Sequence, residues 1–164
     1  MRTYLSKGIV LLAWFLVVPT IIPDQRIPQS KYLADQRLVR IEKFFRDRNC
    51  PAAGLAEEFL VAADRHHLDW RLLPTISFVE SGGGKEYIRN NIMGWGSSRS
   101  AFPTVRSGIH HVATQLATSK YYKNKSLAQK LKTYNPRPIY AQTVLRVMRA
   151  FGPEHLPAVA TASR

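Results

Sequence analysis

The sequence predicts a mainly α-helical fold, and three observations lead to this expectation. Apolar residues recur every three or four positions in six separate stretches, which is the spacing of one buried helix face. Apolar and polar residues do not alternate convincingly anywhere, so the pattern of half-buried strands is missing. The chain has 164 residues and no internal repeat, and this length suits one compact domain with a sizeable core.

The domain is expected over residues 31–152. Its six apolar patterns fall at residues 32–48, 56–63, 70–81, 109–116, 127–134 and 140–151. Asp69 is the expected N-cap of the third helix, and Pro74 lies just past its first turn, where proline can kink a helix. Between Gly82 and Pro103 the helical pattern stops, and Gly, Ser and Asn become frequent. We expect a structured loop, or a short hairpin, in this region at a functional cleft.

Residues 1–23 read as an export segment. Arg2 and Lys7 precede an uncharged run over residues 8–23, which is shorter than the roughly 20 residues that a comfortable membrane span needs. No small-x-small cleavage site follows, so a cleaved signal peptide and an uncleaved N-terminal membrane anchor both stay open. The expected location is the periplasm or cell envelope, either secreted or membrane-anchored. Residues 24–30 then read as a proline-bearing linker, and residues 153–164 as a flexible tail.

Positive charge is concentrated in the second half of the chain. The formal net charge is +13, and 22 of the 24 basic residues remain against 11 acidic ones when Arg2 and Lys7 are set aside. From Tyr87 to the end there are 12 Lys and Arg residues and one acid, Glu154. Such a half attracts anions, and for an exported protein the natural candidate is a cell-wall polymer. Nucleic-acid binding is disfavoured by the export segment and by the lack of a recognition motif.

Cysteine and histidine usage predicts no metal site. Cys50 is the only cysteine, so it cannot form an internal disulfide. The doublets His66-His67 and His110-His111 read as surface residues, because neighbours on a helix point in different directions. We expect a monomer that uses neither a metal nor a cofactor.

Glu80 is the residue that suggests catalysis. If residues 72–81 are helical, its carboxylate falls on the same face as Leu73 and Ile76. Partial burial of a carboxylate beside apolar groups raises its pKa. Residues 82–84 are all glycine, so the helix ends there and the backbone stays open to a ligand. The structural alternative is a helix-end carboxylate that is turned into water.

Three motifs occur in order over residues 79–144, VESGGGK, NNIMGWG and YNPRPIYAQTV, and the likeness that they carry covers roughly residues 55–150. Together they resemble the lysozyme-like superfamily of wall-degrading enzymes, and are most similar to the bacterial endo-β-N-acetylglucosaminidases and the related lytic transglycosylases. The resemblance implies a lysozyme-like helical fold and cleavage of peptidoglycan. It also implies two catalytic residues: Glu80 as the acid and base, and Tyr134, which lies beside it and either positions it or stabilises the cationic transition state. The substrate contacts that follow from the motifs are Ser81, Asn90, Asn91, Gly94, Trp95, Asn135 and Tyr140.

The residue types also fit this chemistry without the family. Cleaving a glycosidic bond needs a carboxylic acid that is still protonated near neutral pH. Trp95 offers a flat face for a sugar ring, while Asn90, Asn91 and Asn135 offer donors and acceptors for acetamido and hydroxyl groups. Each has an ordinary structural alternative, namely a core tryptophan, turn residues and a helix end before Pro136.

A second catalytic carboxylate is not evident. No Asp or Glu occurs between Tyr87 and Pro153, and Glu86 is the one acid that closely follows Glu80. The sequence therefore favours a single-acid mechanism in which the substrate supplies the nucleophile, with Glu86 kept as a helper. The expected function is an exported peptidoglycan-cleaving glycosidase. A lytic transglycosylase that leaves 1,6-anhydro ends and a non-catalytic glycan-binding wall module are the alternatives.

Overall fold

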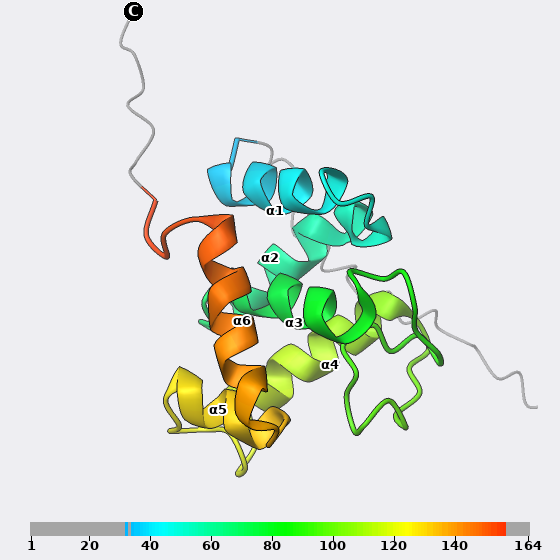
Figure 1. Ribbon diagram of the computed structural model, residues 1–164, viewed down its shortest axis with the longest axis vertical. Helices are drawn as coiled ribbons and strands as arrows, with labels where there is room; N and C mark the ends of the chain where they lie inside the picture. Colours follow the sequence, from blue (N-terminus) through cyan, green and yellow to red (C-terminus); the bar gives the residue numbers. More distant parts are fainter. Residues whose placement is uncertain (1–31, 33, 157–164) are drawn as a thin grey trace, which may run out of the picture.

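The computed structural model describes residue 32 and residues 34–156, and within them the chain is mainly helical, as the apolar spacing predicted (Figure 1). The export segment and linker expected over residues 1–30 lie outside the described residues. In chain order the elements are α1 (Gln36–Arg46), the short 3₁₀ helix η2 (Pro51–Leu55), α2 (Ala56–Arg65), α3 (Leu72–Ser81), α4 (Val105–Thr118), α5 (Leu127–Tyr134) and α6 (Pro138–Phe151). The described residues contain no strand, so residues 82–104 form the expected loop and not a hairpin.

Helix α1 begins later than the sequence pattern indicated. The Asp35 side chain accepts a hydrogen bond from the backbone N–H of Arg37, which caps the helix so that it starts at Gln36. Tyr32, the expected first residue, lies before this cap and is almost fully buried. Its hydroxyl donates to Asp64 on α2. Tyr32 therefore contributes to the core through a tertiary contact. In the sequence its apolar ring looks like one further buried position of the helix.

The prediction that Asp69 is the N-cap of α3 is wrong. Asp69 does not cap the helix, because it accepts the backbone N–H of Arg71 and pairs with the Arg71 guanidinium, and the helix begins only at Leu72. Pro74 therefore falls within the first turn, where its missing N–H has no intrahelical partner to lose. The helix ends at Gly82, whose φ of 62° is the left-handed conformation that glycine adopts most readily.

Helix α3 lies at the centre of the domain, packed against α2 and α6 (Figure 1). Its residues Leu73 and Ile76 are completely buried. Burial of each such side chain stabilises the fold by about 1.5–3 kcal/mol. A cluster of aromatic rings joins the helices around α3; its members are Phe44, Phe45, Phe59, Trp70, Phe78 and Phe151. The core therefore holds the end of α3, where Glu80 lies, in a fixed position.

The C-terminal end of the described chain packs onto this core. The Trp70 indole N–H donates to the carbonyl of Glu154, at 2.9 Å, and the Arg71 guanidinium donates to the carbonyl of Gly152, also at 2.9 Å. Glu154, which belongs to the expected tail, therefore has a defined partner in the core.

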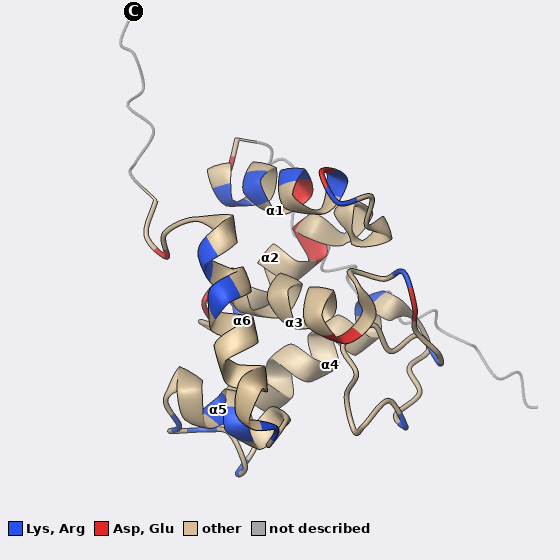
Figure 2. Cartoon of the chain, viewed as in Figure 1, with Lys and Arg blue, Asp and Glu red and all other residues tan. Residues whose placement is uncertain are grey.

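Charge is distributed unevenly over the helices. In Figure 2, α1 carries both signs, whereas α5 and the loop before it carry only Lys and Arg. No Asp or Glu occurs between residues 87 and 153, all of which the structure describes. Among the described helices, none combines the length and the hydropathy that crossing a membrane requires.

Candidate active site

Glu80 lies in the last turn of α3 and is half-buried. Burial of the carboxyl raises its pKa, because the charged form loses water. The Tyr140 hydroxyl and the positive charge of Arg137 act in the opposite direction, but burial dominates. The expectation of a carboxyl on the apolar side of the helix, with a raised pKa, is therefore confirmed. Such a group holds its proton to a higher pH than an ordinary glutamate.

Gly94 brings the loop of residues 82–104 directly against this carboxyl. A Cβ placed on Gly94 would lie 2.3 Å from Oε2 of Glu80 and 2.7 Å from its Cδ. Gly94 also has a φ of +65°, which residues with a side chain rarely adopt. Glycine is thus required here twice, once for the backbone conformation and once for the space that the carboxyl occupies. Gly94, one of the predicted site residues, is brought together with Glu80.

Asn91 holds the loop in this position. It is 2% exposed, and its side-chain amide donates to the carbonyls of Trp95, at 2.9 Å, and Ser100, at 3.1 Å. Its side-chain oxygen accepts the N–H of Trp95 at 3.0 Å. Asn90 acts in the same way, because its amide donates to the carbonyls of Phe102 and Pro103. Both asparagines are therefore committed to the loop itself and shape the site through its backbone.

Tyr134 connects α5 to the same loop. Its hydroxyl donates to the backbone carbonyl of Met93, the residue before Gly94. Burial of this hydroxyl raises its pKa well above the ordinary value, and the charges of Tyr140 and Glu80 add to that effect. Tyr134 thus lies near Glu80, as expected, but its proton is committed to the loop backbone. Its direct effect is to hold Gly94 against the carboxyl.

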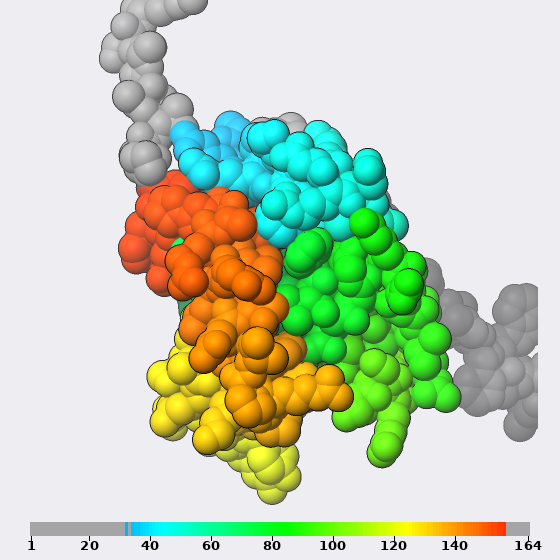
Figure 3. Space-filling view, in the orientation of Figure 1, coloured from blue at the N-terminus to red at the C-terminus, as the bar shows by residue number. Residues whose placement is uncertain are grey.

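Tyr140 on α6 is the tyrosine whose hydroxyl interacts with the Glu80 carboxyl. The residue is 6% exposed, and its hydroxyl has no hydrogen-bond partner of normal geometry among the described residues. Burial and the negative charge of Glu80 raise its pKa, so the hydroxyl stays protonated beside the carboxyl. Its ring is parallel to that of Tyr134, with 6.1 Å between ring centres. In Figure 3 the segments that carry Glu80 (green) and Tyr140 (orange) meet on one face of the molecule.

The other predicted residues have structural roles or stand apart. The Ser81 hydroxyl is buried, donates to the carbonyl of Ser77 and accepts the N–H of Gly84, so it closes the end of α3. The side chain of Asn135, the residue that ends α5, accepts the N–H of Arg137. Glu86 is exposed and makes no side-chain hydrogen bond or ion pair with any described residue.

Trp95 lines an aromatic pocket beside Gly94. The pocket has a volume of about 370 Å³, and its lining residues are Gly94, Trp95, Gly96, Ser97, Tyr121, Tyr122, Thr133 and Tyr134. The Trp95 ring contacts the rings of Tyr134 and Tyr122, with centres 5.4 and 5.8 Å apart. The sequence reasoning missed Tyr121 and Tyr122, which follow α4 without any motif. Two adjacent tyrosines within a lysine-rich segment were the available signal.

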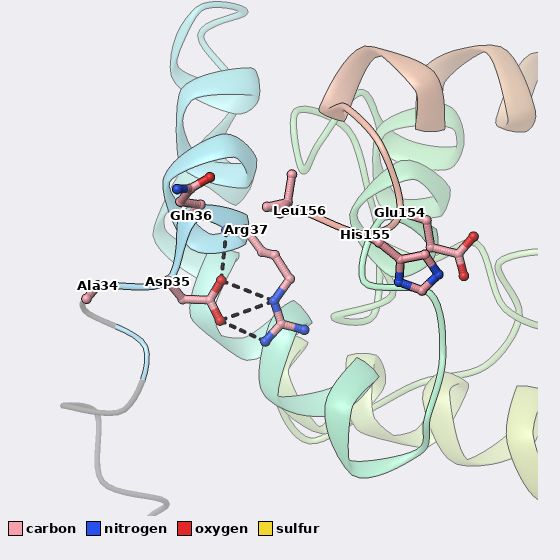
Figure 4. A pocket seen from close by; sticks show the side chains of 7 residues that line it. All are labelled: Ala34, Asp35, Gln36, Arg37, Glu154, His155 and Leu156. Atoms are coloured by element: carbon pink, nitrogen blue, oxygen red, sulfur yellow. Dashed lines mark hydrogen bonds and ion pairs between the residues drawn. The ribbon is translucent and has the colours of Figure 1, made fainter. Parts of the chain in front are cut away.

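Another cavity, of about 390 Å³, lies between the start of α1 and the last described residues. Figure 4 shows Asp35 and Arg37 on one side of it, and Glu154 and His155 on the other. The Arg37 guanidinium is already paired with Asp35 and with Asp64. None of the residues predicted for the site lines this cavity. It therefore adds nothing to the chemistry around Glu80.

The described residues offer no obvious metal centre. Nowhere in this part of the chain do three or more His, Cys, Asp or Glu side chains gather so that they could hold an ion. His110 was expected on the surface, but its side chain is only 24% exposed and pairs with Glu58. This pair lies between α2 and α4 and lowers the pKa of Glu58. It is a structural contact between the two helices.

The chain matches no protein-family model, and no curated protein is significantly similar to it in sequence. The interpretation of the site therefore depends on the residues around Glu80 and on their geometry.

Proposed function

We propose that the chain is an exported glycosidase that cleaves the glycan strands of peptidoglycan, with Glu80 as its acid and base. One observation carries this proposal: a half-buried carboxyl with a raised pKa lies between a glycine that leaves room for it and the buried hydroxyl of Tyr140, which interacts with it. A general acid for glycosidic cleavage must be protonated near neutral pH and must be reachable by the leaving oxygen. The surroundings of Glu80 favour the first condition, and partial exposure allows the second.

In this mechanism the neighbouring residues have distinct roles. Glu80 donates its proton to the leaving glycosidic oxygen. Tyr140 positions the carboxyl through its hydroxyl and stabilises the carboxylate that forms when the proton leaves. Tyr134 holds the loop through the carbonyl of Met93, so it affects Glu80 only indirectly, through the position of the loop. Trp95 contributes an aromatic face to the glycan.

The bond-breaking step uses a nucleophile from the substrate. Glu86 is exposed, and no other acid follows it before Glu154. The acetamido oxygen of the substrate attacks the anomeric carbon while the glycosidic bond breaks and its oxygen takes the proton from Glu80. Water then opens the resulting ring, and the Glu80 carboxylate takes the proton that water loses. The products have reducing ends, as in endo-β-N-acetylglucosaminidases.

A lytic transglycosylase is the second candidate, and the same lone acid favours it. Here Glu80 gives its proton to the leaving oxygen as the glycosidic bond breaks, and the 6-hydroxyl of the same muramyl residue then bonds to the anomeric carbon and transfers its proton to the Glu80 carboxylate. The fragments then end in a 1,6-anhydro ring and are one water lighter. A non-catalytic glycan-binding module is disfavoured, because a pure binder gains nothing from a desolvated acid beside a buried tyrosine hydroxyl.

Export remains part of the proposal, because it depends on the charged and apolar pattern of residues 1–23. The segment is a signal peptide or an N-terminal anchor. Export would bring the enzyme to the side of the membrane on which its proposed substrate, the cell wall, lies.

The test compares the full-length protein with Glu80→Gln and Glu86→Gln on purified wall sacculi. Glu80→Gln keeps the shape of the side chain and removes its proton, so cleavage should be lost. Glu86→Gln is the matched control, because it makes the same change at an exposed position. Circular dichroism checks that both variants are folded, and mass spectrometry of the released fragments distinguishes reducing from 1,6-anhydro ends.

Two results would contradict the proposal. Turnover by folded Glu80→Gln close to that of the wild type would remove Glu80 as the acid. A loss by Glu86→Gln as deep as that of Glu80→Gln would replace the single-acid mechanism with one that uses two carboxylates.

A further inference from the structure

We infer that the lysine-rich end of the domain docks on a membrane surface that carries anionic lipids. We call this end, which comprises α5 and the loop of residues 119–126 before it, the lysine face. Its lysines are Lys120, Lys123, Lys125, Lys130 and Lys132. The inference goes beyond the proposed function, because it assigns a partner to a surface that takes no part in cleavage by Glu80.

The loop before α5 is folded compactly, so its lysines gather with those of the helix. The backbone N–H of Lys123 donates to the carbonyl of Ser119 at 2.8 Å, which closes the loop on itself. The Lys125 ammonium donates to the Thr133 hydroxyl at 2.8 Å, which ties the loop to α5. In Figure 2 this end of the molecule carries Lys and Arg and no acid. The loop and the helix therefore form one basic surface.

Three of these lysines are available to an anionic partner. Lys120, Lys123 and Lys132 are exposed, and their ammonium groups form no hydrogen bond or ion pair with any described residue. The Lys130 ammonium, by contrast, already donates to a backbone carbonyl of α4 at 2.7 Å. No Asp or Glu occurs between residues 87 and 153. The lysine face thus presents positive charge that no acid of this stretch neutralises, and such a surface attracts anions.

An exposed aromatic ring on the lysine face favours a membrane over a soluble anionic polymer. Tyr121 is 62% exposed, and the Lys120 ammonium lies 5.2 Å from its ring centre. Tyrosine is typical of the membrane–water interface because it combines an apolar ring with a polar hydroxyl, and lysines beside it keep their charge among the headgroups. A soluble polymer would use only the charge. In Figure 3 this segment (yellow) protrudes at one end of the molecule, where a flat surface can reach it.

Docking through the lysine face would bring the active site close to the lipid. Tyr121 also lines the pocket beside Gly94, and Gly94 is the residue that leaves room for the Glu80 carboxyl. If Glu80 cleaves glycan as proposed, the docked enzyme would act on strands that lie near the membrane. The docking itself does not depend on that reaction.

The test measures co-sedimentation of the full-length protein with two kinds of vesicle, one of phosphatidylcholine alone and one that also contains anionic phosphatidylglycerol. Each lysine near an anionic surface contributes about fivefold to the affinity. The triple variant Lys120→Gln, Lys123→Gln and Lys132→Gln should therefore bind the anionic vesicles on the order of 100-fold more weakly, with little change on the neutral ones. Residues 1–23 are the same in every variant, so their own affinity for lipid cannot produce this difference.

The matched control removes three charges from α1, at the opposite end of the domain (Figure 1). Its substitutions, all at exposed positions, are Arg40→Gln, Lys43→Gln and Arg46→Gln. This control has the same net charge as the lysine variant, but it should keep most of the wild-type affinity for anionic vesicles. Circular dichroism checks that both variants are folded.

A soluble polyphosphate chain distinguishes a bilayer from other polyanions. Tyr121→Ser should bind anionic vesicles more weakly than the wild type and polyphosphate equally well, because only a bilayer accepts the ring. Wild-type protein that binds both kinds of vesicle equally would overturn the inference, as would an α1 control that loses as much affinity as the lysine variant. Undiminished vesicle binding by Tyr121→Ser would also overturn it and leave a general polyanion site.

These outcomes are separate from those of the proposed function. Glu80→Gln should bind anionic vesicles as tightly as the wild type, whether or not it cleaves sacculi. A protein that docks through its lysines but does not cleave glycan would keep the membrane surface and lose the enzyme. A protein that cleaves sacculi through Glu80 without a preference for anionic vesicles would keep the enzyme and lose the membrane surface.

Discussion

Replacing Gly94 with alanine tests the contact between the loop and the Glu80 carboxyl. The added methyl group would lie 2.3 Å from Oε2 of Glu80, whereas ordinary contacts begin at 3.4 Å. The carboxyl must therefore move by about 1 Å, and a misplacement of this size costs on the order of 100-fold in rate. Stability should change less, because the colliding atoms belong to the end of a flexible side chain. The left-handed backbone of Gly94 adds about 1–2 kcal/mol when a Cβ is present.

Gly82→Ala is the matched control for this prediction. Gly82 has a similar φ, +62°, but a Cβ there would meet only the Lys85 side chain, at 3.5 Å or more. Both variants should lose a similar free energy of unfolding in urea denaturation, while only Gly94→Ala should lose turnover of sacculi. If the two folded variants cleave sacculi equally fast, the position of the Glu80 carboxyl against the loop does not matter for catalysis, and the reasoning fails.

Three further predictions follow from the same contacts. Tyr140→Phe should lower the free energy of unfolding by about 1 kcal/mol or less, because it removes the interaction of one buried hydroxyl with the Glu80 carboxyl. It should also move the alkaline limb of the pH–rate profile upward, since that hydroxyl lowers the pKa of Glu80 and the protonated acid is the active form; an unmoved limb would disconnect the two residues. Asn91→Ala should lower the free energy of unfolding by about 3 kcal/mol, about 1 for each of its lost hydrogen bonds, and a smaller loss than for Asn135→Ala would refute its role in the loop. Glu80→Gln should stabilise the fold increasingly as pH rises. The pKa of Glu80 is raised on folding, so its contribution to stability is complete below the ordinary carboxyl pKa and is lost as pH rises through the folded-state pKa. Glutamine does not titrate, so the variant loses no stability over this range. Thermal melts at about pH 4 and about pH 7 that show the same difference between variant and wild type would contradict this prediction.

Much of the helical framework was predictable because its signal is local. Apolar residues at helical spacing identified α2, α4, α5 and α6, and the bounds of α5 agree with the expected residues 127–134. The same periodicity placed Glu80 beside Leu73 and Ile76, and the glycines after it marked the end of α3. These properties depend on residues three or four apart, which are always neighbours on a helix.

Errors arose where a distant partner changes the meaning of a local pattern. Tyr32 continues the apolar spacing of α1, but it lies outside the helix and reaches Asp64 instead. Asp69 has the right side chain for an N-cap, but the turn that it stabilises precedes the helix. The same residue types cap helices and stabilise turns, so the sequence cannot distinguish the two roles. Only the backbone conformation of the folded chain does.

The sequence by itself determined the helical class, the partly buried acid at the end of α3 and the concentration of positive charge after residue 87. Tertiary structure alone decided what surrounds that acid. The approach of Gly94 to Glu80, the bond from Tyr134 to Met93 and the interaction of the Tyr140 hydroxyl with Glu80 join segments far apart in the chain. Such contacts depend on how helices and loop pack in space, and packing between distant segments leaves no periodic trace along a single sequence.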